Sequence, residues 1–229
     1  MEELFKKYDI ELSEKELLLF EKFLWIFIEK NSSINLSAIR EKDDIIEKHF
    51  IDSIIVKKFT SIEGKILDLW TWGWFPWIPL KIVDEYNSEF VLVDSIWKKV
   101  KVVNEFISQL WLENIKAIQA RAEELWQDIN HREKYNLVVS RATSYLPTLL
   151  EYAIPLLSVW WILIAYKLDD EDEIKKSQKA LSMLNAEIAV IKKYEINWQK
   201  RVFLFIQKIW PTHKKYPRII WEPLKNPLI

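Results

Sequence analysis

Residues 65–80 read KILDLWTWGWFPWIPL, and this stretch decides the fold. The apolar run 65–69 is typical of a buried β-strand, and a helix is expected to begin near Pro76. The tight turn between them carries four tryptophans within residues 70–77. An indole ring requires roughly 150–250 Å² of burial, whereas such a turn needs positive φ angles and a close backbone approach to a ligand, which favour glycine. With glycine in place of each tryptophan, this is the glycine-rich turn of nucleotide-cofactor folds.

The whole chain shows the same pattern, because its 229 residues include 13 Trp and only 2 Gly, against an average glycine usage of about 7%. Most other tryptophans stand where turns or element ends are expected, namely Trp97, Trp111, Trp126, Trp160, Trp161, Trp198, Trp210 and Trp221, with Trp160 and Trp161 just before a strand. We hypothesise that about twelve tryptophans stand at glycine codons, as happens when UGA codons that the source organism reads as Gly are translated as Trp. Trp25, inside the first predicted helix, has the character of a core residue, and its identity stays open.

From residue 65 onward, short β-branched runs alternate with helical segments. Strands are expected at 65–69, 90–94, 115–119, 135–140 and 162–167. A helix follows each of them, and the last helix runs from about Asp170 to Lys192. This alternation predicts an α/β fold with a mostly parallel, doubly wound sheet. Two final runs, 194–198 and 201–207, have no helix between them and predict an antiparallel hairpin.

The N-terminal part is predicted to be helical. Ser13 and Glu16 have the spacing of a capping box, and apolar residues then recur at helical spacing. A second amphipathic helix is expected from Asp43 to about Phe59. We therefore expect a helical region over residues 1–60 and an α/β domain over residues 61–229.

Composition and charge narrow the class of protein. A net charge of −1 and 50% hydrophobic residues indicate a soluble globular protein. The chain has no cysteine, and its three histidines are scattered, so neither disulfides nor a metal site is expected. No signal peptide or membrane span is visible, and we expect a cytoplasmic protein. From Trp198 onward the chain has seven basic residues and one acidic residue, which indicates either a polyanion contact or a solvated tail.

Further motifs accompany the turn in a fixed order. They are NLS at 35–37, HFIDS at 49–53, VDS at 93–95, LENI at 112–115, RAEE at 121–124, SRA at 140–142 and KKYPR at 214–218. Together with the turn, the chain resembles the bacterial small-subunit ribosomal RNA guanine-N7 methyltransferases (RsmG, or GidB). The resemblance runs from about residue 10 to the end, and its departures are the tryptophans at glycine positions.

The resemblance implies a Rossmann-like class I methyltransferase domain that uses S-adenosylmethionine (AdoMet). It also implies small-subunit ribosomal RNA, or a ribosomal particle, as the partner. We expect a monomeric enzyme without membrane contact. The residues placed against the cofactor by their motifs are Trp70, Phe75, Ala122, Glu123 and Arg141.

The position of one acidic residue in the chain indicates a contact with the cofactor independently of the resemblance. Asp94, followed by Ser95, closes the second strand 24 residues after Trp70, where an acidic side chain accepts hydrogen bonds from ribose hydroxyls. Asp68 is placed to orient the turn or the amino group of the cofactor, or else to cap the following helix.

Arg141 is the catalytic candidate, as a residue that positions substrate or cofactor; the alternative is an ordinary ion-pair residue. Glu123 and Glu124 begin a helix, so a contact with the helix dipole competes with a cofactor contact. His49 and Asp52 are expected to fasten the helical region to the core. Guanine N7 carries an unprotonated lone pair, so its methylation needs alignment and no general base.

Two other functions stay open at this point. An NAD-dependent oxidoreductase also fits a glycine turn followed by Asp94, since the turn motif alone is weak evidence. A tryptophan-rich RNA-binding module without enzymatic activity would need exposed indole rings on one face. If the turn truly contains tryptophans, we expect weak AdoMet binding or none.

Overall fold

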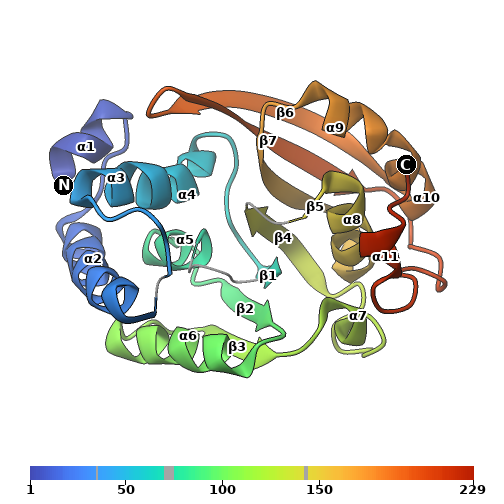
Figure 1. The fold of residues 1–229 in the computed structure, drawn as a ribbon, viewed down its shortest axis with the longest axis horizontal. Helices are drawn as coiled ribbons and strands as arrows, with labels where there is room; N and C mark the ends of the chain where they lie inside the picture. The colour runs from blue at the N-terminus through green and yellow to red at the C-terminus, as the bar shows by residue number, and fades with distance from the viewer. Residues whose placement is uncertain (35, 70–74, 142–143) are drawn as a thin grey trace.

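The computed structural model describes all residues except 35, 70–74 and 142–143, and it leaves out the side chains of residues 34, 122 and 123. Its described part contains one seven-stranded sheet with the order β3-β2-β1-β4-β5-β7-β6 (Figure 1). The strands are β1 Lys65–Leu69, β2 Glu89–Asp94, β3 Ile115–Gln119, β4 Tyr135–Arg141, β5 Leu157–Leu168, β6 Ala186–Ile196 and β7 Gln199–Lys208. Strands β1 to β5 pair in parallel, and β7 runs antiparallel to both β5 and β6. The predicted parallel sheet with a closing hairpin is confirmed.

Helices cover both faces of the sheet, because alternate strand residues point to opposite sides. On one face, α2 Glu14–Ile34, α5 Trp77–Ile82 and α6 Trp97–Gln109 share a core with Ile66, Phe90 and Leu92. On the other, α8 Leu146–Ala153 and α10 Gln178–Leu184 share a core with Leu67, Val91 and Val138. Short helices α7 Ala122–Leu125, α9 Glu171–Lys176 and α11 Glu222–Lys225 complete the layers. The result is the three-layer arrangement of Figure 1.

The strand order reverses beside β1, which lies between β2 and β4. Leu67 of β1 is in register with Val91 on one side and with Val138 on the other. The carboxyl ends of β1, β2 and β4 therefore meet at one edge of the sheet, where doubly wound folds bind ligands.

The N-terminal region is helical, as predicted, and shares the core of the sheet. After α1 Glu2–Lys7 and α2, residues 42–58 form one run of helical turns: α3 Lys42–Ile45, a π-helical turn Ile46–Ile51, α4 Asp52–Ile54 and a 3-10 turn Ile55–Lys58. The capping box is confirmed, since the Ser13 N–H donates to Glu16 over 2.7 Å and the Glu16 N–H donates to the Ser13 hydroxyl over 3.3 Å. The predicted domain boundary near residue 60 stays a prediction.

The predicted long helix from Asp170 to Lys192 is wrong. The chain forms α9 and α10 and then enters β6 at Ala186. Asn185 adopts a left-handed conformation with φ of 59° and ends the helix, as residues just past a helix end often do. The following segment pairs with β7 along its whole length and exposes most of its side chains, including lysines, as edge strands commonly do.

Two expectations about tryptophans are also wrong. Trp25 is 62% exposed on α2 and is not a core residue, because it lies on the solvent face of that helix. Trp160 and Trp161 lie inside β5 rather than before it. A register shift opposite Tyr135 and Leu137 lets β5 begin earlier, at Leu157, and continue through an irregularity.

Candidate functional site

Two buried carboxyl groups lie at the carboxyl ends of β1 and β2. Asp68 and Asp94 are 1% and 3% exposed. Asp94 accepts a hydrogen bond from the N–H of Ile96 over 2.8 Å, and the Lys99 ammonium is 3.7 Å away. Asp68 Oδ2 has no hydrogen-bond partner among the described residues. Burial, and then the charge of Asp94, raise the pKa of Asp68 well above its usual range. A buried carboxyl group of this kind can receive a cationic or hydrogen-bond-donating ligand.

The other predicted cofactor residues on this side follow β2 and β3. Ser95 is exposed, and its carbonyl accepts a hydrogen bond from the Gln119 side chain over 3.3 Å. The N–H of Ala120 donates to the carbonyl of Asp94 over 3.2 Å, which brings the start of α7 next to the end of β2. Ala122 and Glu123 begin α7, as predicted, but their side chains lie outside the described set. Trp70 also lies outside the described residues.

Phe75 belongs to the hydrophobic core, where its ring lies beside those of Phe23, Phe27 and Phe50, and it also contacts two polar side chains. Its ring is buried and stacks on the imidazole of His49, with centroids 4.4 Å apart and an interplanar angle of 14°. The guanidinium carbon of Arg141 is 5.6 Å from the same ring centroid. His49 Nε2 lies 2.9 Å from the Ser37 hydroxyl. Burial, then the charges of Arg141 and Arg201, lower the pKa of His49 to about 3, so this imidazole is neutral near pH 7 and does not serve as a proton shuttle there.

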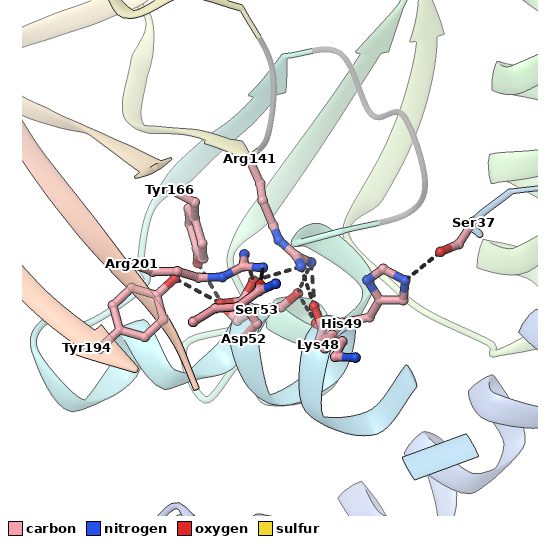
Figure 2. Close-up of polar contacts among 10 residues, drawn as sticks. Ser37, Lys48, His49, Asp52, Ser53, Arg141, Tyr166, Tyr194 and Arg201 are labelled. Atoms are coloured by element: carbon pink, nitrogen blue, oxygen red, sulfur yellow. Dashed lines mark hydrogen bonds and ion pairs between the residues drawn. The ribbon is translucent and has the colours of Figure 1, made fainter. Parts of the chain in front are cut away.

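Arg141 ends β4 and turns its guanidinium towards the helical run 42–58 (Figure 2). It pairs with Asp52 over 2.7 Å and donates to the Ser53 hydroxyl over 3.4 Å. It also donates to the backbone carbonyls of Lys48 and His49. These contacts are the ones expected if His49 and Asp52 fasten the helical region to the core. They also give Arg141 an ion-pair partner within the protein.

The sequence reasoning assigned Asp52 only a fastening role and missed that it collects several partners. Its carboxylate, fully buried, also accepts from Arg201 over 2.8 Å and from the Tyr194 hydroxyl over 2.9 Å. Both partners come from the C-terminal hairpin. The available signal was an acidic residue inside the apolar HFIDS stretch, because a carboxylate buried in a helix needs a cation.

Much of the basic charge near the C-terminus is neutralised inside the protein. Arg201 pairs with Asp52, Lys208 with Glu133 over 2.7 Å, and Arg218 with Glu151 over 2.7 Å. Four lysines of the tail remain exposed, namely Lys200, Lys214, Lys215 and Lys225. The exposed basic surface is therefore smaller than the count of basic residues in the C-terminal sequence implies.

The backbone separates the described tryptophans into groups. Trp111, Trp160, Trp198 and Trp221 have φ of 53°, 72°, 64° and 70°, values that favour glycine and are outliers for bulky residues. All four side chains are also exposed. Trp77 differs, because it is fully buried in α5 and its Nε1 has no hydrogen-bond partner among the described residues. The four left-handed positions agree with the glycine hypothesis, whereas the φ angles of Trp77, Trp97, Trp126, Trp161 and Trp210 are not positive and do not require glycine.

The strand order, the antiparallel final hairpin and the acidic residues at the ends of β1 and β2 are those of the Rossmann-like class I methyltransferases, whose methyl donor is AdoMet. Solved structures of this class are similar in fold. A methyltransferase from Pyrococcus furiosus has a TM-score of 0.55 and 13% identity, covering 82% of this chain and 98% of that one. A SAM-dependent methyltransferase from Aquifex aeolicus has a TM-score of 0.53 and 14% identity, covering 72% and 93%.

Sequence relatives define the family within this class. A family model described as rRNA small subunit methyltransferase G matches residues 16–202. Two relatives are named ribosomal RNA small subunit methyltransferase G. The protein from Fusobacterium nucleatum is 39% identical, over 100% of this chain and 97% of the relative. The protein from Acetivibrio thermocellus is 37% identical, over 96% of this chain and 92% of the relative. The chain belongs to the rRNA small subunit methyltransferase G family. This membership disfavours both the NAD-dependent oxidoreductase and the non-enzymatic RNA-binding module.

Among the helices of the described residues, none combines the length and apolar character needed to cross a bilayer.

Proposed function

We propose that this chain transfers the methyl group of AdoMet to N7 of a guanine in small-subunit (16S) ribosomal RNA. The observation that carries the proposal is the pair of buried carboxyl groups, Asp68 and Asp94, at the strand-order reversal of a chain in this family. Asp94 has the Lys99 ammonium nearby, whereas Asp68 Oδ2 has no hydrogen-bond partner among the described residues, and such a buried oxygen suits a ligand that brings a hydrogen-bond donor.

The chemistry of the residues supports binding of the cofactor. We propose that Asp94 accepts hydrogen bonds from the ribose hydroxyls and that Asp68 Oδ2, which has no hydrogen-bond partner among the described residues, meets the amino group. Ser95, Ala122, Glu123 and Trp70 are proposed as further cofactor contacts from their motifs. When bound, AdoMet supplies an electrophilic methyl group. The protein has to hold the guanine in line with that group and exclude water.

No general base is required of this chain, because N7 of neutral guanine has a free lone pair. The histidine nearest the site agrees with that requirement, since His49 is held neutral and buried under Phe75 and Arg141. Arg141 is proposed to position the reacting groups rather than to exchange a proton. Its removal is expected to reduce methyl transfer while the fold remains.

We infer that the functional form carries glycine at most of the tryptophan positions. Four described tryptophans stand at left-handed φ angles with exposed side chains. The densest group, at residues 70–77, falls on the cofactor turn of the family. An indole at these positions would keep the backbone N–H groups away from the cofactor.

The RNA partner is proposed to meet the exposed lysines of the C-terminal part, among them Lys200, Lys214 and Lys215. Such contacts to phosphates give affinity that does not depend on sequence and falls steeply with salt. A target base within folded RNA must also be unpaired or splayed out before its N7 can reach the cofactor. The enzyme is proposed to act as a cytoplasmic monomer, with its α/β domain over 61–229 and its helical region over 1–60.

The test is transfer of labelled methyl groups to small-subunit RNA, with the tryptophan chain and with a variant carrying glycine at all tryptophans except Trp25. We expect the glycine variant to label RNA at a guanine. RNA transcribed with 7-deazaguanine is the matched control, because it lacks the accepting nitrogen and is expected to take up no label. Absence of label with the glycine variant, or label in the 7-deaza RNA, would contradict the proposal.

A further inference from the structure

Asp52 joins three strands to the helical region. Its carboxylate is fully buried in α4 and accepts from Arg141 of β4 over 2.7 Å, from Arg201 of β7 over 2.8 Å and from the Tyr194 hydroxyl of β6 over 2.9 Å. Figure 2 shows these side chains converging on Asp52 from different elements. A single carboxylate thus balances two guanidinium groups, and its loss would leave both without their shared counter-charge.

The neighbouring residue extends this cluster to a fourth strand. The Ser53 carbonyl accepts from the Tyr166 hydroxyl of β5 over 2.8 Å, and the Ser53 hydroxyl accepts from Arg141 over 3.4 Å. Two consecutive residues therefore hold the ends of four strands against the helical run 42–58. Because side chains locked by several partners keep one geometry, Arg141 is oriented by this cluster.

The cluster contacts a second residue that the motifs assign to the candidate site. Arg141 belongs to the SRA motif, and Phe75 belongs to the motif of the cofactor turn. Arg141 lies against the Phe75 ring, and His49 of the helical run 42–58 stacks on that ring. The orientation of Arg141 thus affects the packing of the Phe75 ring.

We propose that Asp52 is a positioning residue for methyl transfer. It fixes Arg141, and through Arg141 the ring of Phe75, two residues that their motifs assign to the reaction site. Arg201 and Tyr194 are the parts of the C-terminal hairpin that hold the Asp52 carboxylate in place. The inference rests on the proposed function, since it concerns the site of that reaction.

A second ion pair of the hairpin provides a control. Lys208 lies at the other end of β7, is fully buried, and donates to the partly exposed Glu133 over 2.7 Å and to the Leu157 carbonyl over 2.8 Å. Both pairs attach β7 to the rest of the fold, but only the Asp52 pair contacts Arg141. Glu133→Gln therefore reports the cost of leaving a buried cation of this hairpin without its carboxylate, away from the site.

The first measurement is binding of sinefungin, a non-reactive AdoMet analogue, by calorimetry below the unfolding temperature. It uses the form of the chain, with tryptophan or with glycine in the turn, that binds the analogue. Asp52→Asn is expected to weaken binding about tenfold and to lower kcat at saturating AdoMet by up to about 10²-fold, because small displacements of positioning groups cost rate. Glu133→Gln is expected to lower Tm but to leave affinity and kcat unchanged.

The double variant Asp52→Asn/Arg201→Gln separates positioning from charge balance. It removes one carboxylate and one guanidinium, so the net charge of the cluster equals that of the parent. We expect Tm to recover most of the loss caused by Asp52→Asn, while kcat stays low, because Arg141 still lacks its carboxylate. This variant also keeps the test valid if Asp52→Asn alone does not fold.

Three results would overturn the inference: unchanged kcat and affinity in Asp52→Asn, equal losses in Glu133→Gln, or recovery of kcat together with Tm in the double variant. Failure of the proposed function is distinguishable. In that case the parent binds sinefungin in an Asp52-dependent manner but labels no RNA, whereas failure of the inference alone leaves RNA labelling intact and independent of Asp52.

Discussion

Left-handed positions on the surface and the helix α2 carry tryptophans of similar exposure on very different backbones. Trp25 in α2 is 62% exposed, and Trp160 and Trp221 are 59% and 53% exposed. Trp25 lies within a regular helix, whereas the other two have φ of 72° and 70°. Exposure alone therefore does not tell which tryptophans occupy glycine positions. The backbone conformation separates the two groups, because the left-handed region favours glycine over other residues.

The cofactor turn extends this comparison from stability to binding. At an exposed left-handed position, an indole strains the backbone but does not obstruct a ligand. At residues 70–77, the same replacement falls where a cofactor has to approach the chain. Glycine is thus expected to restore stability in the first region and ligand affinity in the second.

The largest expected effect comes from restoring glycine at residues 70, 72 and 74 together, with Trp77 kept because it is fully buried in α5. We expect the affinity for AdoMet, measured by calorimetry, to rise by about 10³-fold, or about 4 kcal/mol, because the bulky side chains no longer exclude the ligand. The control variant carries glycine at the left-handed positions 111, 160, 198 and 221 and is expected to leave the affinity for AdoMet unchanged. Equal affinities of the parent and the turn variant would show that tryptophan belongs in this segment.

The second prediction concerns glycine at the four left-handed positions, 111, 160, 198 and 221. Relief of the strained conformation, offset by the larger entropy of glycine in the unfolded chain, is expected to stabilise the protein by about 0.5–1 kcal/mol per site and roughly 2–4 kcal/mol in total. Chemical denaturation measures the sum. The matched control carries alanine at the same positions, which removes the rings without freeing φ. If the alanine variant gains as much as the glycine variant, the benefit comes from removing exposed rings and not from the backbone.

Local patterns were sufficient to predict most of the fold and failed where one residue or a distant partner decided the outcome. The parallel strands were predicted because each is a β-branched run between turn signals. The missed strand β6 follows a helix that ends at the single left-handed residue Asn185, and the segment after it contains the helix formers Ala, Glu and Lys. The same segment also contains the β-branched residues Ile188, Val190 and Ile191, so local composition did not decide between helix and strand before its pairing with β7 was known.

The candidate site also contains residues that local sequence predicts and residues that only distant contacts bring together. Asp68 and Asp94 were found from sequence because a residue that ends a strand is placed at the ligand edge by topology alone. The cluster around Asp52 unites residues 52, 141, 194 and 201, which no spacing rule connects. The neutralisation of Arg201, Lys208 and Arg218 was missed for the same reason, since their acidic partners are distant in the chain.

A third prediction tests the ligand edge through pH. The raised pKa of Asp68 means that the folded state prefers the protonated acid, so this group lowers stability as pH rises from the unfolded-state value of about 4 through its folded-state pKa. Asp68→Asn is expected to raise Tm, by an amount that grows as pH increases above about 4. The same variant is expected to bind AdoMet about tenfold more weakly, because it loses a charge-assisted hydrogen bond.

The two readouts of this variant belong together. Thermal unfolding over a series of pH values and calorimetry at neutral pH are the measurements. A gain in Tm that does not change with pH would contradict the raised pKa of Asp68, and an unchanged affinity would remove Asp68 from the cofactor site. The result also bears on the turn, because Asp68 lies two residues before its first tryptophan.

The smallest expected effect completes the comparison at Trp25. Glycine in the interior of α2 exposes the backbone and has more entropy to lose on folding, so Trp25→Gly is expected to destabilise the protein by about 1 kcal/mol. This is the opposite sign from glycine at Trp160 or Trp221, whose side chains are about as exposed. Chemical denaturation at neutral pH measures this change in the free energy of unfolding. The control is Trp25→Ala, which keeps helix propensity and is expected to change the free energy of unfolding little. Its one expected loss is the contact of the ring with the Lys42 ammonium, which lies 4.2 Å from the ring centroid. A stabilising Trp25→Gly would mean that exposed rings, and not left-handed backbone, set the cost of the tryptophans.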